Sequence, residues 1–280
     1  MKRVLVALAV TGAFAIGACS HGDRSPSVSI VATDDGYVAP DTIPEGLNHI
    51  VFENHGSTIH ECMFVRLPDG MSAAEYVDSV AAGYNFPPGA IDCSGSGLTS
   101  PLERVELWIP LEAGRYLLAC WFRGHLEHTT PHTLVVHGAQ ETPVVPPRED
   151  VTLKLIDFRY EMIGHVKLGM QTIRVETVGP SMHEVDCFRM EATYKRDDLA
   201  AWYANHMDGS PHATALGGVL DKHDLSSPVW MRRGFTVGHY VLWCDMPMIQ
   251  KGKKSDAGSA AHATHGEAGM VMEFDVSVSP

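Results

Sequence analysis

Short runs of alternating apolar and polar residues fill most of the chain, with glycine and proline between them. Residues 28–31 and 151–156 open two such series, and further runs follow at 48–54, 62–67, 104–109, 115–120 and 172–178. Alternation with a period of two places one side of a run in a core and the other in solvent, as in a half-buried strand. Many short strands between turn residues predict an all-β chain built as β-sandwiches.

The pattern occurs twice along the chain. With Val28 set against Val151, an offset of 123 residues, identical residues coincide at Tyr37 and Tyr160, Gly46 and Gly169, Ile50 and Ile173, Gly56 and Gly179, and His60-Glu61 and His183-Glu184. After one inserted residue, a Gly-x-Tyr-x-x-x-Cys motif ends at Cys120 in one copy and at Cys244 in the other. This repeat predicts two domains, residues 28–137 and 151–280, joined by a proline-rich linker at 138–150.

One short helix interrupts the strands of each copy. In the first copy, Ser72 and Glu75 form a capping-box pattern, and Gly83 is placed to end the helix. In the second copy, we expect Asp197 or Asp198 to cap a helix that turns Leu199 and Trp202 inward. These segments predict a short flap helix on each sandwich.

The N-terminus has the features of an export signal. A basic Met1-Lys2-Arg3 precedes the apolar run 4–16, which is shorter than the roughly 20 residues a membrane span needs. The junction Ile16-Gly-Ala-Cys19 resembles the lipobox of bacterial lipoproteins. We expect a signal peptide at 1–18, lipidation of Cys19, membrane attachment through that lipid and a tether at 19–27. Ser20, in place of aspartate, favours the outer membrane over the inner one, with the protein facing the periplasm.

Composition narrows the function. Of 280 residues, 21 are Lys or Arg and 34 are Asp or Glu, which gives a formal charge of -13 and argues against a nucleic acid partner. The chain contains 16 His and 13 Met, whose imidazole and thioether groups are copper ligands. With Cys19 acylated, five cysteines remain, so at least one is unpaired or binds a metal. Cys62 and Cys93 are candidates for a disulfide, and Cys187 is expected to be a buried thiol.

Three features together point to a family. A histidine begins a middle strand of each copy, a cysteine ends the Gly-x-Tyr strand, and the chain closes with His265-Gly-Glu-Ala-Gly-Met270 before a last strand. This arrangement resembles the cupredoxins, the blue-copper proteins of the plastocyanin and azurin class. The resemblance implies two tandem Greek-key β-sandwiches, with copper held by two imidazoles, a thiolate and a weak axial thioether.

The resemblance also implies the ligands. In the second copy they are His183, Cys244, His265 and Met270, although 20 residues separate Cys244 from His265 and His262 is an alternative to it. In the first copy, His60 and Cys120 match, the second histidine is His125, His128 or His132, and no axial methionine follows. Copper is therefore expected mainly in the second copy, with a second ion in the first as a weaker prediction.

The expected role is electron transfer or copper handling with a redox or copper-delivery partner protein. The alternative is a degenerate, metal-free pair of domains that serves as an interaction module in the envelope. The sequence argues against an enzyme. Copper nitrite reductases and multicopper oxidases use His-x-His pairs or a histidine directly before the cysteine, whereas Ala119 and Trp243 occupy that position here.

Overall fold

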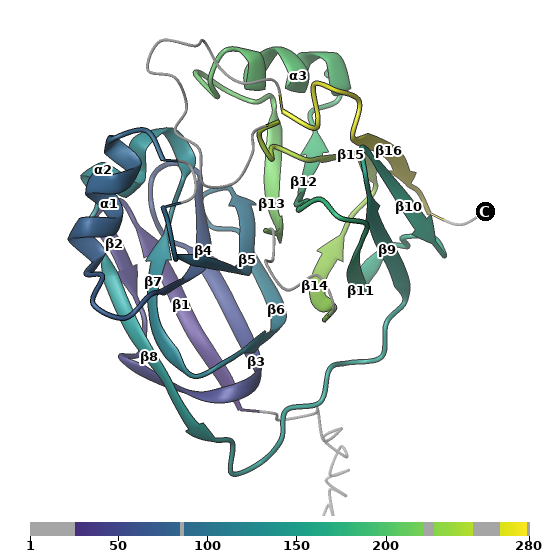
Figure 1. Ribbon diagram of the computed structural model, residues 1–280. Helices are drawn as coiled ribbons and strands as arrows, with labels where there is room; N and C mark the ends of the chain where they lie inside the picture. Colours follow the sequence, from purple (N-terminus) through teal and green to yellow (C-terminus); the bar gives the residue numbers. More distant parts are fainter. Residues whose placement is uncertain (1–25, 85–86, 221–226, 249–263, 279–280) are drawn as a thin grey trace, which may run out of the picture.

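A computed structural model describes residues 26–84, 87–220, 227–248 and 264–278, and Figure 1 shows its ribbon. Over these residues the chain forms sixteen strands, three short α-helices and one 3-10 turn. The prediction of an all-β fold is confirmed. None of the described helices has the length and apolar character needed to cross a membrane.

The first half contains eight strands and two α-helices. Its strands are β1 (Ser27–Thr33), β2 (Gly36–Val38), β3 (Thr42–Asn54), β4 (His60–Leu67), β5 (Ile91–Thr99), β6 (Arg104–Leu111), β7 (Gly114–Ala119) and β8 (His132–Ala139). Its helices are α1 (Ala73–Ala81) and α2 (His125–His128), the latter preceded by the 3-10 turn η1 (Phe122–Gly124).

The second half has the same order of strands with one helix. Its strands are β9 (Val151–Ile156), β10 (Arg159–Ile163), β11 (Gly169–Val178), β12 (Val185–Met190), β13 (Ala213–Val219), β14 (Val229–Phe235), β15 (Gly238–Trp243) and β16 (Val271–Val276), and its helix is α3 (Arg196–Ala204).

Equivalent strands pair in the same register in both halves. The first strand of each half runs parallel to the third, with Val28 opposite Ile50 in one half and Val151 opposite Ile173 in the other. The strand that begins at or just after the repeated histidine, His60 or His183, pairs in both halves with the strand that precedes the cysteine. The offset of 123 residues therefore describes the strand pairing as well as the sequence.

Two strand pairings join the halves. Strand β6 pairs with β14, where Leu107 lies opposite Met231, and β5 pairs with β13, where Thr99 lies opposite Leu216. Each layer of the first sandwich thus continues into a layer of the second (Figure 1). One hydrophobic cluster contains buried side chains of both halves, so the halves share part of a core.

Hydrogen bonds from side chains strengthen this junction. Arg233 is buried, donates to the carbonyl oxygens of Arg104 (2.8 Å) and Leu216 (2.9 Å), and forms an ion pair with Glu103. Asp186 accepts a hydrogen bond of 2.7 Å from the backbone N–H of Leu98. The junction therefore combines apolar contacts with hydrogen bonds and an ion pair.

The two helices differ at their N-termini. The capping box expected at α1 forms, with Ser72 and Glu75 bonding reciprocally. Helix α3 begins earlier than expected, because Lys195 is its N-cap and Asp198 is already in its first turn. The Asp198 carboxylate accepts a hydrogen bond from the Lys195 N–H at 2.8 Å, so a residue of the first turn satisfies the backbone N–H of the N-cap.

The disulfide expected between Cys62 and Cys93 does not form. Both residues are free thiols on the adjacent strands β4 and β5, but Cys62 pairs with Ser96, which places Cys93 farther along the ladder. Cys62 neighbours Tyr37 and Cys120, whereas Cys93 neighbours Arg66 and Tyr116. The two sulfur atoms therefore have different surroundings. Cys187 is buried.

Candidate metal centres

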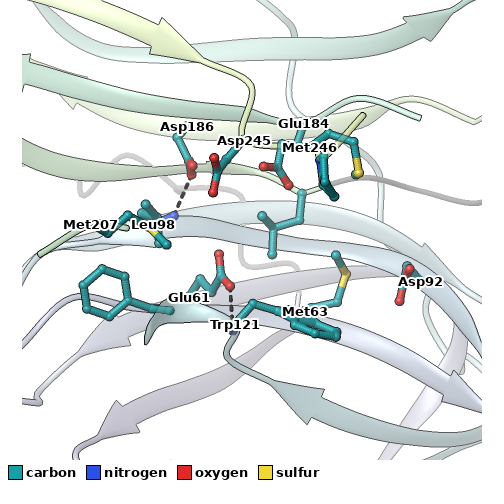
Figure 2. A pocket seen from close by; sticks show the side chains of 13 residues that line it. Glu61, Met63, Asp92, Leu98, Trp121, Glu184, Asp186, Met207, Asp245 and Met246 are labelled. Carbon is teal, nitrogen blue, oxygen red and sulfur yellow. Dashed lines mark hydrogen bonds between the residues drawn. The ribbon is translucent and has the colours of Figure 1, made fainter. Parts of the chain in front are cut away.

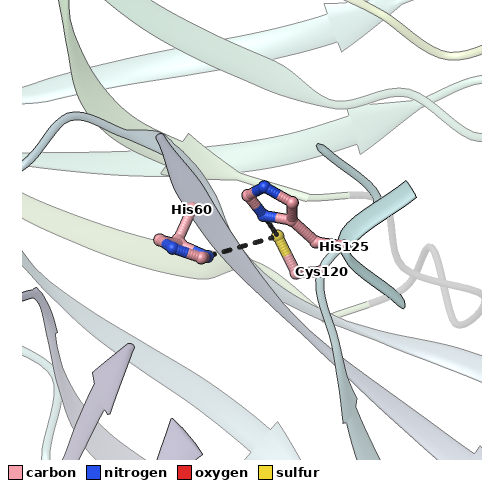
Figure 3. A group of neighbouring side chains, drawn as sticks. All are labelled: His60, Cys120 and His125. Atoms are coloured by element: carbon pink, nitrogen blue, oxygen red, sulfur yellow. Dashed lines mark hydrogen bonds between the residues drawn. The ribbon is translucent and has the colours of Figure 1, made fainter. Parts of the chain in front are cut away.

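The first centre lies where β4 begins and β7 ends. These strands pair with Met63 opposite Ala119, so Cys120 emerges beside His60. The Cys120 Sγ lies 3.9 Å from His60 Nδ1 and 3.5 Å from His125 Nδ1 (Figure 3). One ligand atom from each of the three residues lies within 4.8 Å of the other two.

A tight turn brings His125 back to the cysteine. Arg123 and Gly124 both have positive φ angles, 45° and 78°, which reverse the chain between Cys120 and α2. His128 lies on α2 and His132 on β8, and neither belongs to the group. Among the three histidines that the sequence left open, the structure thus places His125 at the thiol.

The second centre is built in the same way. Cys244 follows β15, and its Sγ lies 3.7 Å from His265 Nδ1, which is 3.0 Å from His183 Nδ1. All three residues are buried. Met270 is fully buried in the same cluster as Cys244, and its N–H donates to the His265 carbonyl at 2.8 Å. His262 lies outside the described residues, as do Cys19 and the signal peptide expected at 1–18.

Each thiol accepts a hydrogen bond from the backbone. The N–H of Glu61 donates to Cys120 Sγ, and the N–H of Glu184 donates to Cys244 Sγ, both at 3.5 Å. In turn, the Tyr37 hydroxyl donates to the Glu61 carbonyl, as the Tyr160 hydroxyl does to that of Glu184. Donors aimed at sulfur favour its anionic form.

Burial sets the protonation of these groups. It raises the pKa of the Cys120 thiol to about 12 and that of Cys244 well above its ordinary value. Burial also lowers the pKa of His125 and His265 to about 4, with His60 and His183 as neighbours adding to the effect. At neutral pH, these two imidazoles are neutral and can bind a cation, which would displace the proton of the thiol.

The geometry fits a copper ion. With bond lengths of about 2.0 and 2.3 Å, as nitrogen and thiolate ligands have to zinc, and a trigonal angle, the two ligand atoms lie about 3.7 Å apart. The sulfur–nitrogen distances of 3.5, 3.9 and 3.7 Å agree with that separation. Two imidazoles and one thiolate form the trigonal donor set of blue-copper sites.

Two aspartates behind the ligands were missed in the sequence. Asp34 Oδ1 lies 3.4 Å from His60 Nε2, and Asp157 Oδ1 lies 2.9 Å from His183 Nε2. The hydrogen bond to His183 lowers the pKa of Asp157 below its ordinary value. These residues are separated by the same 123 positions as the histidines, so the repeat contained the signal that would have identified them.

A cavity of about 210 Å³ lies between the halves (Figure 2). Glu61 and Trp121 line it from the first half, and Glu184, Asp186 and Asp245 from the second, together with apolar side chains. The Glu61 carboxylate accepts from the Trp121 N–H at 2.7 Å. Burial, followed by the charge of Asp186, raises the pKa of Glu61 to about 8, and the same two causes raise that of Asp245. The cavity is therefore lined by carboxyl groups, Glu61 and Asp245, whose raised pKa values favour the protonated form.

Searches against family models and against curated proteins returned no match. Among solved structures, a dithionite-reduced auracyanin from Roseiflexus castenholzii matches with 18% identity and a TM-score of 0.31, covering 40% of this chain and 97% of its own. A multicopper oxidase matches with 13% identity and a TM-score of 0.25, covering 89% and 88%. A copper-containing nitrite reductase from Thermus scotoductus matches with 14% identity and a TM-score of 0.23, covering 90% of this chain and 61% of its own.

These matches correct one expectation from the sequence, namely that the chain is not an enzyme. Structures matched over most of the chain include multicopper oxidases, a laccase and a nitrite reductase. At the identities observed, the likeness concerns the fold alone. The paired sandwiches, whose equivalent strands pair in the same register, agree with the resemblance found in the sequence: the fold of this chain is cupredoxin-like.

Proposed function

We propose that each half of the chain binds one copper ion and that the protein transfers electrons through these ions. The observation that carries the proposal is the convergence of two imidazole nitrogens and one thiol in each half, from residues up to 82 positions apart. Copper bound to such a donor set cycles between two oxidation states, one electron at a time.

The surrounding residues suit that role. Burial of Cys120 and Cys244 keeps water away from the thiolate, and the backbone N–H groups of Glu61 and Glu184 stabilise its charge. In the second half, buried Met270 is the proposed axial thioether that tunes the ion without holding it. The first half presents the three equatorial donors alone within its described group.

Metal analysis with single cysteine variants tests the proposal. The copper-loaded protein should contain two ions and absorb strongly in the visible range, because thiolate-to-Cu(II) charge transfer is intense. Cys120→Ser and Cys244→Ser should each remove one ion and its share of the colour. Cys93→Ser, which alters a free thiol away from both centres, serves as the control. A colourless loaded protein whose Cys120 and Cys244 remain open to alkylation would contradict the proposal.

A second candidate function is copper-dependent redox catalysis in the cavity between the halves. The specific observation is that Trp121 and Asp245, which line the cavity, directly follow Cys120 and Cys244. A small substrate held there would contact residues that are the direct sequence neighbours of the two cysteines. Loaded protein supplied with a chemical electron donor should then reduce oxygen or nitrite while the donor is oxidised, and Leu98→Trp, which fills the cavity, should abolish this turnover while both coppers remain. Absence of turnover with both coppers bound leaves electron transfer alone.

We also propose that the protein is exported and attached to a membrane through a lipid on Cys19, facing the periplasm, where it meets a redox or copper-delivery partner. The basic start, the apolar run and the Ile-Gly-Ala-Cys junction support this location. Cys19→Ser should leave the precursor unprocessed or release the protein from membranes. Normal processing and fractionation with the outer membrane in that variant would contradict the proposal.

A further inference from the structure

In each half, an aspartate carboxylate contacts the proposed ligand histidine at the start of β4 or just before β12. The Nδ1 atoms of His60 and His183 face the other proposed ligands, while their Nε2 atoms face Asp34 and Asp157. Both aspartates lie in the turn between the first two strands of their half. The same arrangement therefore occurs independently in two places.

The backbone passes close over both contacts. A Cβ atom at Gly56 would lie 2.6 Å from His60 Nε2 and 2.7 Å from Asp34 Oδ1, and one at Gly179 would lie 3.0 Å from Asp157 Oδ1. At Gly56 a side chain would displace the aspartate–histidine contact, and at Gly179 it would crowd the aspartate at a φ of 136°, which favours glycine. Gly56 and Gly179 share the offset of 123 residues as well, so glycine, aspartate and histidine repeat as a set.

A carboxylate at Nε2 has two effects on an imidazole that binds metal through Nδ1. It holds the proton on Nε2, which leaves the lone pair on Nδ1, and it makes that nitrogen a stronger donor. A stronger donor with a negative charge one ring away stabilises Cu(II) more than Cu(I). The reduction potential of the bound copper should therefore fall.

We propose that Asp157 and Asp34 are positioning residues for the copper ligands: each fixes the Nε2–H form of its histidine and lowers the reduction potential of the ion in its half. The contact of Asp157 is shorter, 2.9 Å against 3.4 Å, and its side chain is less exposed, 34% against 51%. Asp157 therefore has the larger effect. This inference rests on the proposed copper sites.

The test measures the potential of one centre at a time. In a Cys120→Ser background, where only the second centre is coloured, Asp157→Asn should keep one copper and shift the Cu(I)-to-Cu(II) affinity ratio about tenfold toward Cu(I), which is 59 mV for one electron. In a Cys244→Ser background, Asp34→Asn should shift the ratio in the same direction by about threefold or less. Asp35→Asn, which removes the same charge from the neighbouring position in the turn, is the control.

A second readout needs no copper. Nitrogen NMR of the metal-free protein should show His183 as the Nε2–H tautomer, and Asp157→Asn should change the tautomer populations. Unchanged potential and unchanged tautomer in Asp157→Asn overturn the inference. If the wild-type protein binds no copper, the proposed function fails, while the tautomer still decides whether Asp157 positions His183. If Asp157→Asn does not fold, Asp34→Asn decides the same question in the first half.

Discussion

The two halves bring their second histidine back to the cysteine through loops of very different length. In the first half, four residues separate Cys120 from His125, and the turn through Gly124 returns the histidine directly. In the second half, 20 residues intervene, yet His265 is held by its N–H bonded to the Met246 carbonyl at 2.9 Å, and the Gly266 N–H bonds to the Cys244 carbonyl at 2.7 Å.

A bridge at the base of the long loop explains this result. Pro247 and Thr264 form an isolated antiparallel bridge, which brings together two residues 17 positions apart beside Cys244 and His265. The position of His265 therefore depends on residues next to the bridge and not on the length of the insertion. The comparison teaches that loop length by itself says little about how firmly a ligand is held once the loop is closed at its base.

The largest expected effect on stability comes from weakening the junction between the two halves. Arg233→Met removes the ion pair with Glu103 and leaves the Arg104 and Leu216 carbonyls without their donor. We expect a loss of about 3 kcal/mol in the free energy of unfolding, measured by denaturant titration. Arg232→Met, at the exposed neighbouring position, should change stability little, and equal effects of both variants would contradict this role of Arg233.

The cavity between the halves should make stability depend on pH. The pKa of Glu61 is about 8 in the folded protein, above its ordinary value near 4.5, so between these values the folded state binds more protons than the unfolded state. Glu61 should therefore contribute a fall in the stability of the metal-free protein as pH rises from about 4.5 to 8, whereas His125 and His265, whose pKa values are lowered to about 4, contribute a rise up to about 6.5. Glu61→Gln should flatten that fall and raise the melting temperature at pH 8, whereas exposed Glu45→Gln should not.

If Met270 supplies the proposed axial thioether, removing it should make the second centre resemble the first. Met270→Leu in a Cys120→Ser background should keep the copper and its colour, because the methionine tunes the ion without holding it. We expect the Cu(I)-to-Cu(II) affinity ratio to rise about tenfold, or about 1.4 kcal/mol, in a spectroelectrochemical titration. Met272→Leu on β16 is the control. Loss of copper in Met270→Leu would show that the thioether is an essential ligand.

The smallest effect concerns the flap helices. Ser72→Ala removes one side of the capping box of α1 and should cost about 1 kcal/mol. Lys195→Ser should give α3 the same capping box and stabilise the protein by a similar or smaller amount. Thermal unfolding of the two variants measures both, and opposite signs are the expected outcome.

The repeat in the sequence predicted the all-β fold, many of the strands and the positions of α1 and α3, because alternation and turn residues are local signals, whereas α2 was not predicted. It also indicated His60, Cys120, His183, Cys244 and His265, which the structure brings together in two groups. The choice of His125 depends on backbone angles at Arg123 and Gly124, which spacing alone does not fix.

The junction and the cavity could not be predicted in the same way. Pairing of β6 with β14 joins residues more than 120 positions apart, and an alternating strand carries no mark of which distant strand it will meet. The carboxyl groups of Glu61 and Asp245 became notable only once the halves were placed together. Asp34 and Asp157 were different, since comparing the two copies position by position would have found them.

The pairing at the junction has the symmetry of a homodimer. Leu107 and Met231 are equivalent residues of the two copies and lie opposite each other, flanked by the pairs Trp108–Trp230 and Glu106–Arg232. In a two-fold dimer of identical subunits, the same patch meets itself in this way. The chain is thus organised like a two-fold dimer whose two subunits belong to one covalent chain, which keeps the effective concentration of the halves at the order of millimolar. Because each side of the junction has its own sequence, one half can contain a long insertion where the other has a short turn. Two fragments produced by cleavage within 140–150 should reassociate with each other in preference to pairing with themselves.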